Sequence, residues 1–173
     1  MTVLKEGDLQ ITIGDAINAR KFDDANHGLN NCMKAVDFIV ELLDCYLFIE
    51  IKDPQDPQTP KPSRNEFLRR IKSGELDEDL KYKYRDSFLY EWASGRTNKP
   101  IDYLVLIAME SLDNALLLNR TEDLKRKLPL LGPKARPWLR PPLRSCGVFN
   151  IASWSNRFPQ YPVRRQSAGT TCP

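Results

Sequence analysis

Two apolar runs separated by four residues constrain the fold of this 173-residue chain more than any other feature. They cover residues 35–41 and 46–52, and both are rich in the β-branched and aromatic residues that favour strands. The four residues between them have the length of a hairpin turn. If Leu43 and Asp44 form that turn, paired positions sum to 87, so Asp37 is predicted to lie opposite Glu50.

This register sorts the side chains of both strands onto two faces. Because successive strand residues alternate, Glu50 and Lys52 are expected on the same face as Asp37. The other face is expected to be apolar and buried, and its members are Val36, Phe38, Val40, Leu47, Ile49 and Ile51. Isolated charges in a buried sheet are costly unless they are paired or bound to a metal. The pattern therefore predicts a divalent-metal site, with a cross-strand salt bridge on a solvated face as the alternative.

The residues after Lys52 predict a loop, two helices and a further strand. Four prolines within residues 53–62 exclude regular structure there. Ser63 to Glu66 has the form of a capping box, so a short helix is expected from there to Gly74. A longer helix is predicted from apolar residues that recur every four positions: Leu76, Leu80, Tyr84, Phe88 and Trp92. The last three are expected in the core. The apolar run 101–109 predicts a central strand parallel to 46–52, because a helical crossover joins the two.

The two ends of the chain are read from weaker patterns. Residues 9–13 alternate as a strand does, whereas residues 15–22 are compatible with strand or helix. Residues 114–128 offer a helix, expected to start near Thr121, and residues 147–154 suggest a late strand. We interpret residues 1–165 as a single domain and residues 166–173 as a disordered tail.

Composition narrows the class of protein. No run of 18 apolar residues occurs, so no membrane span is expected. The first residues lack the apolar region of a signal peptide, which indicates a cytoplasmic location. The four cysteines (Cys32, Cys45, Cys146, Cys172) form no Cys-x-x-Cys pair and His27 is the only histidine, so reduced thiols are expected instead of a zinc site.

The net charge of +3 hides an uneven distribution. From Asn119 onward the chain has eleven Lys and Arg residues against two acids, whereas the preceding residues are net acidic. Such an asymmetry is typical of a protein that holds a polyanion with one part and acts on it with another. A solubilising tail, or a patch for an acidic protein, would have the same composition.

The order of elements, with Asp37 on one strand and Glu50-x-Lys52 on the next, resembles the PD-(D/E)xK nuclease superfamily, the fold of many restriction and repair endonucleases. The resemblance covers roughly residues 9–110. It implies an α/β fold whose mixed central sheet forms an αβββαβ-type, restriction-endonuclease-like core with flanking helices, extended here by the basic residues 119–165. Two departures are that Val36 stands where the family often has proline, and that no N-terminal helix supplies a glutamate, for which Glu6 or Asp24 is considered.

The resemblance also implies a chemistry. It predicts an Mg²⁺-dependent (or Mn²⁺-dependent) endonuclease, a hydrolase that acts on nucleic acid, with DNA favoured over RNA. Asp37, Glu50 and the backbone carbonyl of Ile51 would bind the metal, and Lys52 would orient or deprotonate the attacking water. Cutting both strands of a duplex with one site per chain favours a homodimer.

Phosphate contacts are assigned to four arginines outside this cluster. Arg85 is proposed because the family sometimes directs a basic or amide side chain at the site from the equivalent helix. Arg136, Arg140 and Arg144 are proposed because they lie in the basic, proline-rich part of the extension. The alternative function is a catalytically silent nucleic-acid-binding or protein-assembly module on the same fold, because a fold does not determine an activity.

Overall fold

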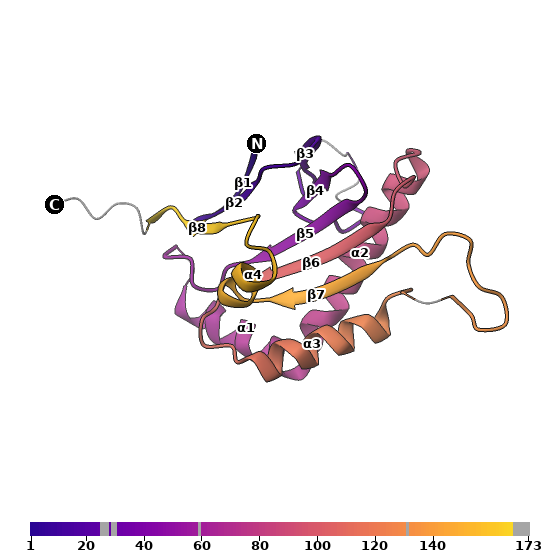
Figure 1. Ribbon diagram of the computed structural model, residues 1–173. Coiled ribbons are helices and arrows are strands. Elements are labelled where there is room, and N and C mark those ends of the chain that lie inside the picture. The colour runs from indigo at the N-terminus through magenta and orange to yellow at the C-terminus, as the bar shows by residue number, and fades with distance from the viewer. Residues whose placement is uncertain (25–27, 29–30, 59, 131, 168–173) are drawn as a thin grey trace.

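The computed structural model describes residues 1–24, 28, 31–58, 60–130 and 132–167, which form a mixed α/β structure with two sheets and four helices (Figure 1). The smaller sheet has the order β1-β2-β8 and contains β1 (Thr2–Glu6), β2 (Leu9–Ile13) and β8 (Val163–Arg165). The larger sheet has the order β3-β4-β5-β6-β7 and contains β3 (Asn18–Lys21), β4 (Phe38–Glu41), β5 (Tyr46–Lys52), β6 (Ile101–Ile107) and β7 (Ser145–Phe149). The helices are α1 (Lys61–Ser73), α2 (Glu75–Ala93), α3 (Asn114–Lys127) and α4 (Ile151–Arg157).

The predicted hairpin and its register are confirmed. Phe38 pairs with Ile49 and Val40 with Leu47 across β4 and β5, and the Leu42 N–H donates to the Cys45 carbonyl at 2.9 Å. The predicted parallel strand is confirmed as well, because β6 runs parallel to β5 with Val105 opposite Glu50. The sheet therefore changes from antiparallel to parallel pairing at β5.

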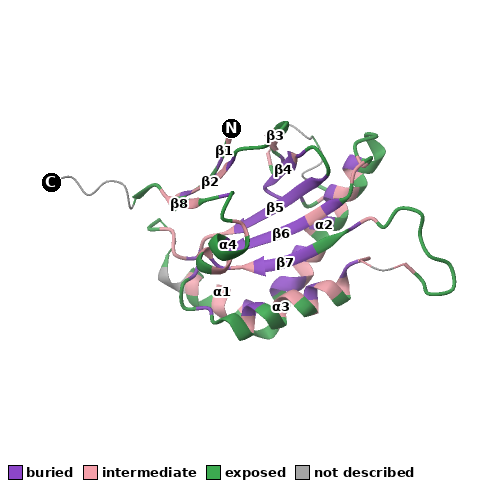
Figure 2. Ribbon diagram, viewed as in Figure 1, coloured by how far each residue is buried: buried purple, intermediate pink, exposed green. Residues whose placement is uncertain are grey.

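Both faces of the larger sheet are covered (Figure 2). Helices α1, α2 and α3 pack on one face, where Ile39 and Phe48 join the first core cluster with Leu80 and Tyr84. The smaller sheet and α4 pack on the other face, where Phe38, Ile49 and the α4 residue Trp154 join the second cluster. Coverage on both sides explains why β6 reads as an almost continuous apolar run.

The first strand of the hairpin begins later than predicted. It starts at Phe38 instead of Ala35, and Val36 belongs to the helix-side cluster instead of the face that contains Phe38 and Val40. The Val36 N–H donates to the Ser87 hydroxyl of α2 at 3.0 Å. Val36 is therefore held against α2, and the alternation of the strand does not extend to it.

The predicted capping box at the start of α1 is wrong. The helix begins at Lys61 with Pro60 as its N-cap, and no side chain caps it. A proline in the first turn has a backbone angle suited to a helix, so the start is displaced to the end of the proline-rich loop. Glu66 instead forms an ion pair with Arg69 at 2.7 Å.

Helix α2 has the predicted extent, but its buried stripe ends differently. Tyr84 is buried and Phe88 packs partly against the core, whereas Trp92 is 62% exposed, so its assignment to the core is wrong. Each four-residue step overshoots a turn of 3.6 residues by about 40°, so the predicted row rotates out of the core. Ser87 and Glu91 continue the buried face in its place.

Three elements near the chain ends differ from expectation. Helix α3 starts at Asn114 and not near Thr121, because the Asp113 side chain accepts the Leu116 N–H at 2.7 Å and caps the helix. The late strand ends at Phe149, since Asn150 and Ser153 form a capping box that starts α4. Residues 163–165 form β8, which pairs with β2 and so joins the last described strand to the N-terminal sheet. Residues 168–173 lie outside the described part.

Of the helices described, none combines the length and apolar character that a bilayer crossing requires. Among the described residues, Cys32, Cys45 and Cys146 form no disulfide bond. His27 and Cys172 lie outside the residues that the structure describes.

Candidate functional site

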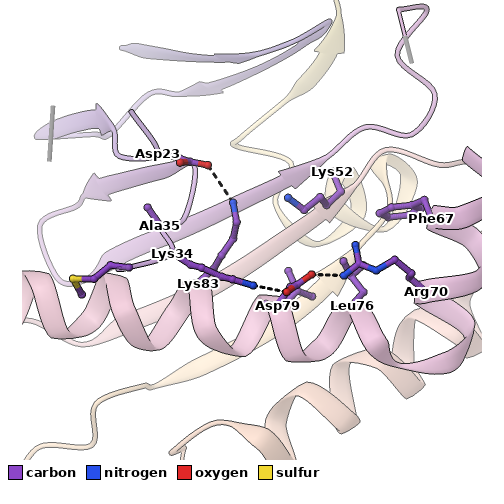
Figure 3. Close-up of a pocket in the computed structure, with 11 residues that line it drawn as sticks. Asp23, Lys34, Ala35, Lys52, Phe67, Arg70, Leu76, Asp79 and Lys83 are labelled. Atoms are coloured by element: carbon purple, nitrogen blue, oxygen red, sulfur yellow. Dashed lines mark hydrogen bonds and ion pairs between the residues drawn. The ribbon is translucent and has the colours of Figure 1, made fainter. Parts of the chain in front are cut away.

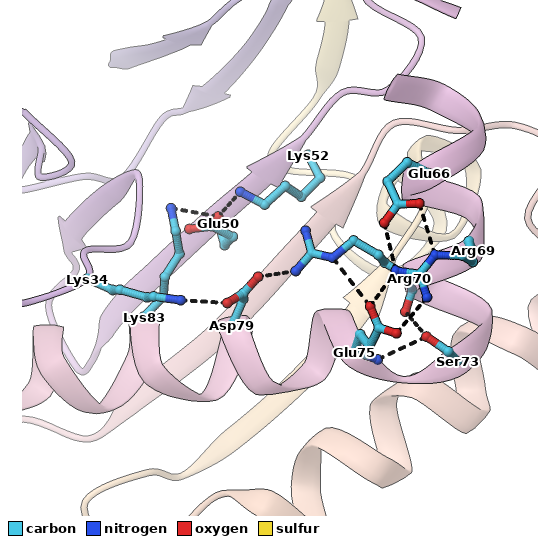
Figure 4. Close-up of polar contacts among 10 residues, drawn as sticks. All are labelled: Lys34, Glu50, Lys52, Glu66, Arg69, Arg70, Ser73, Glu75, Asp79 and Lys83. Atoms are coloured by element: carbon cyan, nitrogen blue, oxygen red, sulfur yellow. Dashed lines mark hydrogen bonds and ion pairs between the residues drawn. The ribbon is translucent and has the colours of Figure 1, made fainter. Parts of the chain in front are cut away.

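Three of the sequence-predicted residues meet at the carboxyl end of β5, on the face that α2 covers. Glu50 and Lys52 are two residues apart on β5, and the Lys52 Nζ lies 2.5 Å from Glu50 Oε1 (Figure 4). The Lys83 Nζ of α2 lies 2.9 Å from the same Glu50 oxygen and 3.5 Å from Asp37 Oδ1. Because one ammonium contacts both carboxylates, the predicted convergence of Asp37, Glu50 and Lys52 is confirmed.

Asp37 is positioned by the backbone of the neighbouring strand. It precedes β4, and its Oδ2 accepts the Ile51 N–H at 2.6 Å, while its own carbonyl accepts the Phe22 N–H at 2.8 Å. These two bonds place its carboxylate beside the last residues of β5. They also link it to the segment that follows β3.

Burial controls the protonation of this cluster. Glu50 is fully buried and Asp37 is 6% exposed. Burial raises the pKa of Glu50 to about 7, against the opposing effect of the charge on Lys52. Burial also raises the pKa of Asp37, although Lys83 and Lys52 counteract it. For Lys83, burial favours the neutral amine, but the charges of Glu50 and Asp37 outweigh it and raise its pKa.

The sequence interpretation missed Lys83 and selected Arg85 on the same helix. Lys83 flanks the buried stripe, three residues after Leu80 and four before Ser87, so its side chain reaches the sheet. Arg85 is exposed and lies two residues further on, about 200° around the helix axis from Lys83. The helical period measured from Leu80 and Tyr84 would have indicated Lys83.

The other three predicted arginines lie away from the cluster. The Arg144 N–H donates to the Ile101 carbonyl at the start of β6, whereas Glu50 lies opposite Val105 further along the sheet. Arg136 and Arg140 are exposed on the connection that leads to the beginning of β7. These arginines therefore occupy the end of the parallel strands opposite to the cluster.

Acids from the first part of the chain pair with much of the basic extension. Arg120 pairs with Asp77, Lys127 with Glu78, Arg144 with Asp102, and Arg165 with Asp53. These four basic side chains are therefore paired with acids that precede the extension in the sequence.

Among the described residues, no three His, Cys, Asp or Glu side chains are grouped to hold a metal ion. The cluster contains two carboxylates, and both oxygens of the buried Glu50 lack a hydrogen-bond partner in the described part, although Oε1 has ion pairs with Lys52 and Lys83. Of the N-terminal acids, Asp23 contacts the Lys83 Nζ at 3.3 Å, and Glu6 pairs with Lys21 at 2.9 Å.

A pocket of about 500 Å³ opens beside the cluster, between α1, the first half of α2 and the segment before β4 (Figure 3). Its polar lining contains four cationic and two acidic side chains, namely Lys34, Lys52, Arg70, Lys83, Asp23 and Asp79. Phe67 and Leu76 are part of its apolar wall. Lys52 and Lys83 belong to both the pocket and the carboxylate cluster, so the two are continuous.

No family model, curated protein or solved structure matches the chain. The geometry of the cluster and its pocket is therefore the basis for any function assigned to it.

Proposed function

We propose that this protein is a divalent-metal-dependent nuclease that hydrolyses phosphodiester bonds, with DNA favoured over RNA. The observation that carries the proposal is Glu50, which is fully buried beside Asp37 and leaves Oε2 without a hydrogen-bond partner among the described residues. A buried carboxylate oxygen without a partner is costly, so a bound cation would supply what the described contacts lack.

The residues of the cluster fit a small, hard cation. Asp37, Glu50 and the Ile51 carbonyl would hold Mg²⁺ or Mn²⁺, since oxygen atoms are the preferred ligands of such ions. The Ile51 N–H points at Asp37, and the N–H and C=O of one residue in a paired strand point to the same side. Its carbonyl therefore faces the side of β5 on which Asp37 lies. When bound, the ion would lower the pKa of a water molecule and neutralise charge on the phosphate.

Lys52 supplies the cationic group of the proposed reaction. Its ammonium contacts Glu50 and also lines the pocket, so it lies between the carboxylates and the space open to a substrate. From there it would orient the attacking water and stabilise the negative charge that develops on the phosphate oxygens. Lys83 would hold the two carboxylates at a fixed separation.

The topology supports the proposed restriction-endonuclease-like core. Strands β3, β4 and β5 form an antiparallel meander, and after α1 and α2 the chain returns as β6, parallel to β5. Ligands in open α/β sheets bind beyond the carboxyl ends of the strands, where the cluster lies. Before β3 the described residues form β1 and β2 and no helix, which departs from the αβββαβ order.

The second candidate is a catalytically silent nucleic-acid-binding or protein-assembly module. One observation favours it: Lys52 and Lys83 together balance the charges of Asp37 and Glu50. A cluster neutralised in this way needs no metal to stay folded. If the nuclease cuts both strands of a duplex, one site per chain favours a homodimer.

Cleavage assays with matched lysine variants test the nuclease proposal. Labelled single-stranded and duplex DNA and RNA are incubated with Mg²⁺, Mn²⁺ or EDTA. Lys52→Ala is expected to lower the cleavage rate by a factor of about 100 or more, in line with loss of a positioned proton-transfer group. Lys72→Ala, an exposed lysine of α1, is the control and should cleave as the wild type does.

The same preparations are melted with and without Mn²⁺. A cation that binds only the folded protein raises the melting temperature by mass action, and Asp37→Asn should reduce that rise. Wild-type protein that cleaves no substrate and shows no metal-dependent shift would leave the silent module as the function. If Lys52→Ala cleaves as fast as wild type, the activity comes from a contaminant in the preparation.

A further inference from the structure

Asp79 holds two cationic side chains from different elements at the wall of the pocket (Figure 3). Its Oδ1 contacts the Lys34 Nζ at 2.5 Å, and its Oδ2 pairs with the Arg70 guanidinium. Lys34 comes from the segment before β4, Arg70 from α1 and Asp79 from α2. Three separate parts of the chain therefore meet through one carboxylate.

The carboxylate occupies the position that an oxyanion would take between these cations. Although burial opposes it, the hydrogen bonds from Lys34 and Arg70 lower the pKa of Asp79, so this group stays ionised. Guanidinium and ammonium groups bind phosphate oxygens with the same charge-assisted hydrogen bonds that they form with carboxylates. Lys34 and Arg70 are each partly exposed, so a ligand in the pocket can reach them.

We propose that the pocket binds one phosphate group of a nucleic-acid strand through Lys34 and Arg70, and that Asp79 takes the place of that phosphate in the ligand-free protein. The identity of the strand as substrate rests on the proposed function. The pocket volume of about 500 Å³ is within the range of roughly 300–1,000 Å³ common for ligand sites. Because Lys52 and Lys83 line the same pocket, a strand held there lies next to Asp37 and Glu50.

The phosphate contacts proposed here, Lys34 and Arg70, are different residues from the arginines of the basic extension that the sequence indicated. Arg140 lines a separate pocket with Trp92 and Pro142, beyond the other end of α2. A strand bound only there would lie away from the carboxylates. Lys34 and Arg70 instead lie beside the residues proposed to do the chemistry.

Binding is measured by fluorescence anisotropy with a labelled 12-nucleotide single-stranded DNA in EDTA, so that no strand is cut. The test variants are Lys34→Gln/Arg70→Gln and Asp79→Asn. The control is Lys125→Gln/Arg126→Gln on α3, which removes the same charge and also breaks ion pairs, with Glu122 and Asp123. Melting temperatures verify that each variant is folded.

The Lys34→Gln/Arg70→Gln variant should bind at least tenfold more weakly than wild type, and Asp79→Asn several-fold more tightly, because the latter releases both cations. Losing the contacts to this one phosphate should also lower the magnitude of the slope of log K against log salt by about 0.7 for a single strand. The α3 control should retain most of the affinity. Parallel probes with a 5′-phosphate, a 5′-hydroxyl and a circular strand identify a terminal or an internal phosphate as the ligand.

Equal binding by wild type, Lys34→Gln/Arg70→Gln and Asp79→Asn would overturn the phosphate site, and so would a wild type that binds no strand at low salt. Metal-dependent cleavage lost only in Lys52→Ala would then still support the nuclease. Conversely, binding that depends on Lys34 and Arg70 in a protein that cleaves nothing would leave the phosphate site standing while the nuclease proposal fails.

Discussion

At the scale of single residues, Glu50 is a carboxyl group buried completely between two lysines. Desolvation penalises its ionised form, and Lys52 and Lys83 compensate only in part, so its pKa is raised to about 7. Its ordinary value of 4.5 applies to the unfolded chain. The folded protein therefore holds this proton more tightly than the unfolded chain over that interval of pH.

The first prediction concerns stability against pH. Between pH 4.5 and about 7 the folded state binds more protons at Glu50 than the unfolded state, so this residue makes the free energy of unfolding fall as pH rises through that window. Glu50→Gln removes the titration. From pH 4.5 to about 7, the free energy of unfolding of the variant, measured by urea denaturation, should rise relative to that of wild type by on the order of 3 kcal/mol.

Glu122→Gln, a partly exposed acid of α3, controls for the loss of one carboxylate. Curves for wild type and Glu50→Gln that stay parallel from pH 4.5 to 8 would show that Glu50 ionises alike in both states. Metal affinity should instead increase as pH rises past about 7. Protons compete with a cation for the Glu50 carboxylate, and this carboxylate loses its proton in that range.

At the scale of elements, α2 combines the core, the carboxylate cluster and the pocket. Leu80 and Tyr84 pack in the core, Lys83 contacts the carboxylates, and Asp79 bridges the pocket cations. The helical period places these functions on adjacent strips of one rigid element. Packing against the sheet therefore also positions the charged groups.

The second prediction tests where the buried stripe of α2 ends. Tyr84 is 1% exposed, packs on Phe48 and Tyr103, and donates its hydroxyl to the Pro142 carbonyl. Tyr84→Ala should cost about 3–5 kcal/mol of unfolding free energy, as large aromatic truncations in cores do. Trp92→Ala should cost less than about 1 kcal/mol, because the ring is largely exposed. Equal losses in chemical denaturation would place Trp92 in the core after all.

At the scale of the whole molecule, Arg165 ties the C-terminal strand to the end of the larger sheet near the site. Its guanidinium pairs with Asp53 at 2.7 and 2.8 Å and with Asp8 at 3.4 Å, and it donates to the Ala108 carbonyl at 3.2 Å. Asp53 directly follows Lys52, and Ala108 directly follows β6. Arg165 of β8 and Asp8 between β1 and β2 thereby stabilise the edge where the carboxylates lie.

The third prediction follows from this arrangement. Arg165→Gln should lower the free energy of unfolding by about 2 kcal/mol, because it leaves the largely buried Asp53 without its charged partner. Arg164→Gln, the adjacent exposed arginine of β8, is the matched control and should change stability by less than about 0.5 kcal/mol. Equal effects of the two substitutions would show that the Arg165 contacts contribute nothing specific.

Local patterns in the sequence determined the centre of the fold and the core of the candidate site. The two runs around a four-residue turn established the pairing of β4 with β5, and period-two alternation then put Asp37, Glu50 and Lys52 on one face. The apolar run of β6 and the intervening helices indicated its parallel pairing with β5. The hairpin and its alternation depend on neighbouring residues, and the parallel pairing follows from the helical crossover rule, so the sequence alone carries these features.

Tertiary packing decided the remaining features. Three sets of contacts join residues that are far apart in the sequence. They are the ion pair of Lys83 with Glu50, the ion pairs of Asp79 with Lys34 and Arg70, and the pairing of β8 with β2. The basic extension has a large surplus of positive charge in the sequence, yet Arg120, Lys127, Arg144 and Arg165 pair with acids of the preceding part. Coulomb attraction acts through distance in space, and only the packing of the helices and sheets determines which charges become neighbours.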